Sequence, residues 1–296
     1  MIQKALFQEI EQRIEVKPFK TQLLKWIGNK QKFANEIVGS FPSSFNKYYE
    51  PFIGSGAVLA TLSPLNALAT DAFPALIEIW QKLKSDPEEL KEWYRSRWEF
   101  ANGENKKEGY EKIKAAYNKN PNGVDFLYLC RSCYGGVVRF RKVDGYMSTP
   151  CGVHEPIKPE SFNHRVDLWS ERVKNTEFRL CGYQDAMKEA KAGDLIYCDP
   201  PYQHSQTILY GGQDFILEEL FVEIEKCRSR GVFVALSIDG TKKSGDVNCA
   251  INVPEKLFEE EIFVNVGRSM LKRFQMEGKT LENEVVSDRL LLTYKI

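Results

Sequence analysis

The stretch Leu195-Ile-Tyr-Cys-Asp-Pro-Pro-Tyr202 decides the predicted fold. Its apolar run predicts a buried strand over 195–198 that ends just before Asp199. Pro200 and Pro201 lack the amide hydrogen that a strand ladder needs, so the chain has to turn at the carboxyl end of this strand. In open α/β sheets, this edge is where ligands bind.

The turn carries three groups that can bind a planar amine. The Asp199 carboxylate and the Pro200 carbonyl can accept hydrogen bonds from an NH2 group, and the Tyr202 ring offers a face for stacking. An Asp-Pro-Pro turn is also a common way to close a strand, because turns favour these residue types. The motif alone therefore leaves a structural role and a binding role open.

Composition predicts a soluble globular protein. The chain has 296 residues, of which 43% are apolar, enough for one large domain or for a domain with a sizeable insertion. No apolar run reaches the length of a membrane span, and residues 1–20 lack the apolar core of a signal peptide, so we expect a cytoplasmic protein. The 41 basic and 41 acidic residues cancel, so a nucleic-acid partner would have to bind to a local basic face.

The seven cysteines are an odd number at irregular spacing, which argues against a disulfide framework. Cys130 and Cys133 form a single CxxC motif, and the chain has only three histidines. A tetrahedral zinc site usually draws four ligands from paired motifs. We therefore expect buried thiols and no metal.

The segment Trp26-Ile-Gly-Asn-Lys30 places an aromatic ring and a cation on either side of a glycine turn. We expect a helix to follow through Phe33 and Ile37. The indole can stack on a small ligand and the ammonium can pair with a carboxylate. A Trp packed in the core and a solvated Lys would give the same pattern.

The segment Tyr48-Tyr-Glu-Pro-Phe-Ile-Gly-Ser-Gly-Ala-Val-Leu59 predicts a short strand, a glycine turn and the start of a helix. Gly54 and Gly56 let the backbone pass close to a ligand, as nucleoside sites require. Leu59 stands where the dinucleotide fingerprint has its third glycine, and the chain has no phosphate-binding P-loop motif. The expected ligand is therefore a nucleoside and not a nucleotide.

Two more acidic residues follow predicted strands. The strand over 65–70 ends on Asp71, which can bind ribose hydroxyls or can cap the helix predicted over 74–83. The strand over 177–180 is followed by Asp185. Further strands are predicted over 232–237, 261–266 and 290–294, and a helix over 215–230. This pattern indicates an α/β fold.

Residues 86–172 differ in character from the rest. Charged and aromatic segments with helical periodicity, over 88–100, 110–117 and 124–134, replace the apolar strands. We therefore predict a catalytic domain of residues 1–85 and 173–296, and an inserted, mainly helical domain of residues 86–172.

A basic segment lies within this insertion. Residues 131–142 include four cations and no acid, and Gly135, Gly136 and Gly145 indicate a turn or hairpin that exposes them. Such a loop can bind phosphates and base edges. A merely solvated basic loop would have the same composition.

Four segments, in this order and spacing, resemble the alpha-class, Dam-like adenine-specific DNA methyltransferases. They are Lys25-Trp-Ile-Gly-Asn-Lys30, Glu50-Pro-Phe-Ile-Gly-Ser-Gly56, Asp71 and Asp199-Pro-Pro-Tyr202. The segment 133–152 is also similar to the DNA-binding hairpin of that family. The resemblance spans nearly the whole chain, and it implies a Rossmann-like class I methyltransferase sheet with an inserted DNA-recognition domain.

The resemblance implies S-adenosylmethionine as the methyl donor and double-stranded DNA as the substrate. The catalytic residues that it implies are Asp199, Pro200 and Tyr202. The implied cofactor site consists of Trp26, Lys30, Phe52, Gly54, Gly56, Asp71, Asp185 and Asp199. The implied DNA contacts are Arg131, Tyr134, Arg139, Arg141, Lys142, Lys272 and Arg273. Ala186 replaces the aromatic residue that is common after the acid, so we expect Phe52 to supply that stacking contact.

The expected function is site-specific transfer of a methyl group from S-adenosylmethionine to the exocyclic amine of an adenine that is flipped out of duplex DNA. A class I methyltransferase that acts on RNA adenine or on a protein amide is the alternative among enzymes, since the same turn fits any planar amide or amine. A DNA-binding module without catalysis is the alternative from another class. A restriction endonuclease that acts independently on the same DNA is a compatible partner.

Overall fold

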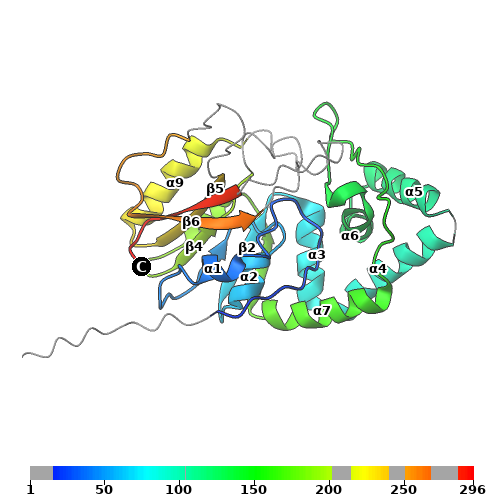
Figure 1. The fold of residues 1–296 in the computed structure, drawn as a ribbon, viewed down its shortest axis with the longest axis horizontal. Coiled ribbons are helices and arrows are strands. Elements are labelled where there is room, and N and C mark those ends of the chain that lie inside the picture. The colour runs from blue at the N-terminus through cyan, green and yellow to red at the C-terminus, as the bar shows by residue number, and fades with distance from the viewer. Residues whose placement is uncertain (1–15, 104, 202–214, 240–250, 268–285) are drawn as a thin grey trace, which may run out of the picture.

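The computed structural model describes residues 16–103, 105–201, 215–239, 251–267 and 286–296. Within these residues, the chain forms a seven-stranded sheet in the order β3-β2-β1-β4-β5-β7-β6 (Figure 1). Each predicted strand is present, and its ends differ from the prediction by a few residues. The strands are β1 (Tyr48–Glu50), β2 (Ala67–Asp71), β3 (Thr176–Leu180), β4 (Leu195–Cys198), β5 (Phe233–Asp239), β6 (Glu260–Gly267) and β7 (Val286–Leu292).

Strand direction decides which residues meet at the ligand-binding edge. Strands β3, β2, β1, β4 and β5 pair in parallel. Strand β7 runs antiparallel to both neighbours, with Arg289 opposite Ile238 of β5 and Asp288 opposite Val264 of β6. The amino end of β7 therefore lies at the same edge of the sheet as the carboxyl ends of the parallel strands. In an open α/β sheet, that edge binds ligands.

Both faces of the sheet are buried, because successive strand residues point to opposite sides and each side packs on helices. Tyr48 and Tyr197 belong to the core on one face, and Tyr49 and Ile196 belong to the core on the other. The first core includes side chains of α1 (Ala34–Val38), α2 (Ala57–Leu62) and α3 (Pro74–Ser85). The second includes side chains of α8 (Tyr183–Glu189) and α9 (Leu217–Ser229).

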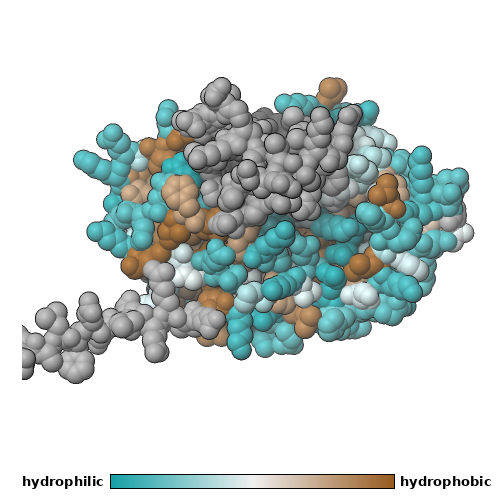
Figure 2. All heavy atoms as spheres, in the orientation of Figure 1, coloured by the Kyte–Doolittle hydropathy of each residue, from teal (hydrophilic) through white to brown (hydrophobic). Residues whose placement is uncertain are grey.

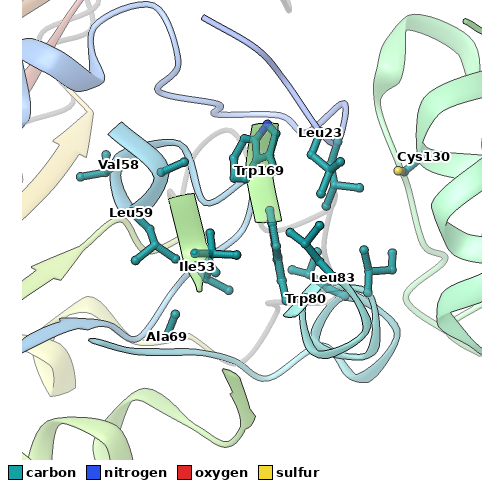
Figure 3. Close-up of a cluster of buried hydrophobic side chains, with 14 of the residues drawn as sticks. Leu23, Ile53, Val58, Leu59, Ala69, Trp80, Leu83, Cys130 and Trp169 are labelled. Atoms are coloured by element: carbon teal, nitrogen blue, oxygen red, sulfur yellow. The ribbon is translucent and has the colours of Figure 1, made fainter. Parts of the chain in front are cut away.

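Two tryptophans tie the glycine turn after β1 to the core. The rings of Trp80 and Trp169 lie side by side, with centroids 5.3 Å apart (Figure 3). The Trp80 indole donates a hydrogen bond of 3.2 Å to the Gly54 carbonyl, and the Trp169 indole donates one of 2.9 Å to the Thr21 carbonyl. These bonds attach the turn, and the segment before Trp26, to a well-packed interior.

Helices fill the interval between α3 and β3. They are α4 (Pro87–Asn102), α5 (Lys106–Lys119), α6 (Gly123–Ser132), the short 3-10 helix η1 (Tyr134–Gly136) and α7 (Pro159–Val173). Asp86 and Asn122 accept hydrogen bonds from the first turns of α4 and α6, because helix amino ends leave amides without partners. In Figure 1, α4, α5 and α6 lie at the end of the molecule away from β5 and β6. Their buried side chains continue the core of the sheet's first face.

The described surface over these helices is mostly hydrophilic in the view of Figure 2, with hydrophobic residues scattered singly. Single exposed hydrophobic side chains are normal for a folded protein.

Some helix predictions differ from the structure. The helix predicted over 124–134 ends at Ser132, because Cys133 adopts an extended backbone with ψ of 160°. Helices α7 and α8 were not predicted. Residues 1–15 lie outside the described residues, and residues 16–19 are not helical.

Candidate active site

Four acidic residues reach the ligand-binding edge from four strands. Glu50 ends β1, Asp71 ends β2, and Asp199 follows β4. Asp288 lies near the amino end of the antiparallel β7, which brings it to the same edge. Three of these carboxylates lie together because parallel strands have their carboxyl ends at the same edge of the sheet. The fourth lies there because β7 runs in the opposite direction.

Lys30 is buried between two of these carboxylates. Its side chain is 4% exposed, and its Nζ lies 2.9 Å from Asp199 Oδ1 and 3.2 Å from Asp288 Oδ2. Burial would lower the pKa of the ammonium, but attraction to both carboxylates outweighs burial and raises that pKa. Lys30 is therefore charged at neutral pH, and it holds Asp199 at the end of β4.

Glu50 is a buried acid beside this group. Its Oε2 accepts a hydrogen bond of 2.6 Å from the Tyr48 hydroxyl. Burial, together with the negative charge of Asp199, raises the pKa of Glu50 from its ordinary value of 4.5 to about 8. Glu50 is thus mostly protonated at neutral pH. Because β1 and β4 pair in parallel, with Tyr49 opposite Ile196, the turn after β4 lies beside the end of β1.

The turn after β1 has a backbone that glycine adopts most easily. Gly54 has a φ of 46° and Gly56 a φ of 63°, both in the left-handed region. A Cβ at Gly54 would lie 3.0 Å from the indole nitrogen of Trp26. Trp26 itself packs edge-on against Phe126, with ring centroids 6.1 Å apart. The predicted cofactor residues Trp26 and Gly54 are therefore neighbours in the fold.

Asp71 supports the same turn from β2. Its Oδ2 accepts a hydrogen bond of 3.2 Å from the Gly54 amide, and its Oδ1 accepts one of 3.1 Å from the Phe73 amide. Burial raises the pKa of Asp71 to about 6, and these hydrogen bonds oppose the shift. The N-cap of α3 is Phe73, so Asp71 is not its cap. Each oxygen keeps a second lone pair that a ribose hydroxyl could use.

An aromatic group lies beside the turn. Phe52 and Tyr183 stack with ring centroids 5.1 Å apart, and Phe215 packs edge-on against Phe52 at 5.8 Å. Tyr183 is buried, and its hydroxyl has no hydrogen-bond partner among the described residues. Asp185 lies in the first turn of the same helix, α8, where its carboxylate is 71% exposed and 3.2 Å from the Lys188 ammonium.

The hairpin predicted in the inserted segment is present. Phe140 and Met147 pair in antiparallel fashion, and the loop that joins them projects from the body beside α6 (Figure 1). At its tip, Arg141 pairs with both oxygens of Asp144, at 3.0 Å and 2.5 Å. The Arg141 guanidinium also lies 4.3 Å from the centroid of the Tyr146 ring. These contacts give the guanidinium a defined direction.

Four predicted DNA contacts lie at the surface of this region: Tyr134, Arg139, Arg141 and Lys142. Arg131 does not. Its side chain is buried, at 4% exposed, and it donates hydrogen bonds to the carbonyls of Gln22 and Leu23. A guanidinium that points inward to main-chain carbonyls cannot reach a phosphate. This position is inconsistent with the predicted DNA contact, and Arg131 instead anchors the segment that precedes Trp26.

Three predicted site residues, Tyr202, Lys272 and Arg273, lie outside the described residues. Two residues of the edge were not predicted as part of the site, Glu50 and Asp288. Glu50 belongs to the motif before the glycine turn, but the sequence pattern does not predict that its side chain is buried. Asp288 lies just before the strand predicted over 290–294, and no local pattern indicates that this strand is reversed.

Among the residues that the structure describes, no group of three or more His, Cys, Asp or Glu side chains could hold a metal ion. In the same residues, no helix has the length and apolar character needed to cross a membrane.

The strand order, the reversed β7, and the two turns at the carboxyl edge define a class I methyltransferase fold. The chain belongs to the D12 class N6 adenine-specific DNA methyltransferases, whose family pattern matches residues 26–248. It is therefore an enzyme that methylates adenine in DNA. This assignment rejects the alternatives of an RNA or protein methyltransferase and of a binding module without catalysis.

Named relatives agree with the family. A DNA adenine methylase of Vibrio cholerae is 27% identical over 230 residues, which cover 72% of this chain and 79% of the relative. The Type II methyltransferase M1.LlaDCHI of Lactococcus lactis is 28% identical, over 76% of this chain and 82% of the relative. The Type II methyltransferase M.MjaIII of Methanocaldococcus jannaschii is 32% identical, over 64% of this chain and 70% of the relative.

Proposed function

We propose that this enzyme takes its methyl group from S-adenosylmethionine and transfers it to the exocyclic amine of an adenine flipped out of duplex DNA at specific sites. Flipping is needed because an amine inside a duplex cannot reach a donor held at the edge of a sheet. The observation that carries the proposal is the position of Asp199. Lys30 pairs with its carboxylate at the end of β4, and β4 pairs in parallel with β1, after which the glycine turn begins.

The residues around the glycine turn fit the proposed cofactor. Left-handed glycines let the main chain approach a ligand, and a Cβ at Gly54 would meet the Trp26 indole. Asp71, at the carboxyl end of β2, would accept hydrogen bonds from ribose hydroxyls. The Phe52 ring offers a surface for an adenine, and the buried Tyr183 hydroxyl beside it lacks a partner among the described residues. Asp185 remains a predicted ligand of that adenine.

The bound donor supplies a methyl group that is already activated by the sulfonium charge. The protein's task is to make the adenine amine a better nucleophile, because its lone pair is delocalised into the ring. The Asp199 carboxylate and the Pro200 carbonyl would accept hydrogen bonds from the two N–H groups of the amine and favour a pyramidal nitrogen. They would also stabilise the positive charge that grows on nitrogen during transfer, an effect felt most strongly in the transition state.

Alignment supplies a second contribution. Holding the amine in line with the methyl group removes translational and rotational freedom before the reaction, which can lower the barrier by as much as about 7–11 kcal/mol. In this proposal, Tyr202 stacks on the flipped base. No titrating base is required, since the amine proton becomes acidic only after the new bond forms.

The hairpin would hold the DNA. Arg139 and Lys142 are exposed there, and Arg141 is oriented by Asp144 and Tyr146. Arg side chains read guanine edges by paired hydrogen bonds, and Lys side chains neutralise phosphates. Lys272 and Arg273 are proposed as further phosphate contacts. Because such contacts release counterions, binding should weaken strongly as salt rises.

Asp199→Ala and Asp199→Asn test the proposed site. The purified variants are incubated with S-adenosylmethionine and with DNA that lacks N6-methyladenine, and the product is measured by mass spectrometry of the nucleosides. We expect the single-turnover rate to fall by about 100- to 1,000-fold or more, because acceptors used mainly in the transition state are lost. The circular dichroism spectrum should be unchanged.

Asp167→Asn is the matched control, because Asp167 is an exposed carboxylate on α7 that also pairs with a lysine, Lys91. It should retain the wild-type rate. Retained turnover in Asp199→Ala would reject the proposed catalytic role. Failure of S-adenosylhomocysteine to bind the wild-type protein in calorimetry would reject the proposed cofactor.

A separate restriction endonuclease is a proposed partner in the cell, supported by the names of two relatives as Type II methyltransferases. It would act on the same DNA sequence and would need no contact with this chain. Sequencing of modified bases in a host that expresses the enzyme would identify that sequence.

A further inference from the structure

Asp288 reaches the proposed catalytic carboxylate through Lys30. It comes from the amino end of β7, and its Oδ2 lies 3.2 Å from Lys30 Nζ. The same nitrogen lies 2.9 Å from Asp199 Oδ1. Residues 30, 199 and 288, far apart in the sequence, therefore form one chain of charges: carboxylate, ammonium, carboxylate.

The geometry places Lys30 between two competing partners. A lysine side chain has a flexible stem and a compact charge that can donate in several directions. With Asp199 as its single anionic anchor, the ammonium could follow that carboxylate as it rotates. A second carboxylate on a sheet strand restrains the ammonium at one place. The contact with Oδ1 then restrains the rotation of Asp199 as well.

We propose that Asp288 is a positioning residue for methyl transfer, which holds Lys30 so that the Asp199 carboxylate keeps the orientation that the target amine requires. This inference rests on the proposed role of Asp199. Asp288 touches no reacting atom in this scheme and acts through Lys30. It also shares the positive charge of Lys30, so that Asp199 keeps more of its strength as a hydrogen-bond acceptor.

The ionisation of Lys30 can be followed by experiment, through the pH dependence of the transfer rate. Burial by itself lowers the pKa of a lysine, and here two carboxylates reverse that effect. Removal of the Asp288 charge should therefore lower the pKa of Lys30. At pH values above that lowered pKa, Lys30 is neutral and no longer restrains Asp199, so the rate of transfer should fall. Other titratable groups near this cluster on β1 and β4 are Tyr48, Glu50, Tyr197 and Cys198.

Asp288→Asn tests the inference, because it removes the charge with little change in shape. The single-turnover rate on DNA is measured across pH, with affinity for S-adenosylhomocysteine and for DNA determined separately. We expect the rate at neutral pH to fall by about 10- to 100-fold, since small misplacements of reacting groups have effects of this size. The rate should also begin to decline at a lower pH than in the wild type. Both affinities should change little.

Two further variants separate positioning from structure. Asp288→Glu keeps the charge, so the pH at which its rate begins to decline should be that of the wild type. Its longer side chain can lower the rate at every pH without moving this point. It also provides the test if Asp288→Asn does not fold. Arg289→Gln is the matched control, because Arg289 is the next residue of β7 and pairs with Glu261 instead of Lys30. It should retain the wild-type rate and pH profile.

The outcomes distinguish this inference from the proposed function. A wild-type rate and pH profile in Asp288→Asn would overturn the inference and leave the proposed function intact. A lower rate in Asp288→Asn with an unchanged pH profile would mean a purely structural role and would also overturn the inference. A pH profile of Asp288→Glu displaced from that of the wild type would overturn it as well. Turnover in Asp199→Ala would instead refute the proposed site itself.

Discussion

Glu50→Gln should change how the stability of this enzyme depends on pH. Glu50 is buried, and its pKa is raised from 4.5 to about 8 in the folded protein. In the unfolded chain the side chain is hydrated and keeps the ordinary value. The folded state therefore binds this proton more tightly than the unfolded state, and the wild-type protein loses stability as the pH rises from 4.5 to 8.

The magnitude follows from the two pKa values. One unit corresponds to about 1.4 kcal/mol, and Glu50 releases its proton more readily in the unfolded chain than in the folded protein. Relative to acid pH, this difference therefore lowers the unfolding free energy by about 2 kcal/mol at pH 6 and by about 4–5 kcal/mol at pH 9. Gln has the same shape and no charge, and its carbonyl can accept the hydrogen bond from Tyr48. The unfolding free energy of the variant, minus that of the wild type, should therefore grow by about 2–3 kcal/mol between these pH values.

Urea denaturation at pH 6 and pH 9, followed by circular dichroism, measures this difference. Glu171→Gln is the control, because Glu171 is an exposed glutamate on α7 that is solvated in both states, and it should follow the wild type at both pH values. Asp199→Asn should also weaken the dependence of the unfolding free energy on pH, but by less than Glu50→Gln. The negative charge of Asp199 contributes only part of the rise in the pKa of Glu50. If the stability curves of Glu50→Gln and the wild type run parallel, Glu50 is not a buried neutral acid and the reasoning fails.

Three further results are expected. Gly56→Ala should destabilise the protein by about 2–4 kcal/mol in urea denaturation, because a left-handed Ala is strained and its Cβ would lie 3.1 Å from the Trp80 ring. Gly145→Ala is its partner experiment: it has a similar φ and open space around it, so a loss of about 1 kcal/mol is expected, and equal losses would contradict the packing argument. Arg131→Met should cost about 1–3 kcal/mol of stability, because main-chain carbonyls lose their donor, without changing the salt dependence of DNA binding. Arg139→Ala should leave the stability within about 0.5 kcal/mol of the wild type and should relax recognition at one base pair, so an unchanged methylation pattern would exclude a base contact.

The Arg131 and Arg139 pair shows where composition misleads. Both are cations of one basic segment, and nothing in their residue type separates them. Arg131 lies in the last turn of α6, most of whose residues are buried, whereas Arg139 lies on the exposed hairpin. Burial follows from how helix α6 docks against the segment that contains Leu23, which is a long-range contact. The basic composition of the segment thus identified the region and not the individual contacts.

The sequence by itself determined the parts of this protein that depend on local sterics and on one strand at a time. Prolines end a strand at Asp199, glycines allow the left-handed turn at Gly54 and Gly56, and apolar runs form the buried strands. These signals were enough to predict the α/β fold, and the resemblance of four motif segments, in their order, implied the methyltransferase family. The same signals were also enough to place Asp71 and Asp199 at one edge, because parallel strands share the direction of their carboxyl ends.

Only the tertiary structure decided which charges meet. Lys30 lies between Asp199 and Asp288 because β7 is inserted between β5 and β6 and runs against them. The direction of a strand is set by packing on both faces of the sheet, not by its own few residues. The raised pKa of Glu50 has the same origin, since burial in a common core and the nearness of Asp199 belong to the assembled sheet and to no single segment.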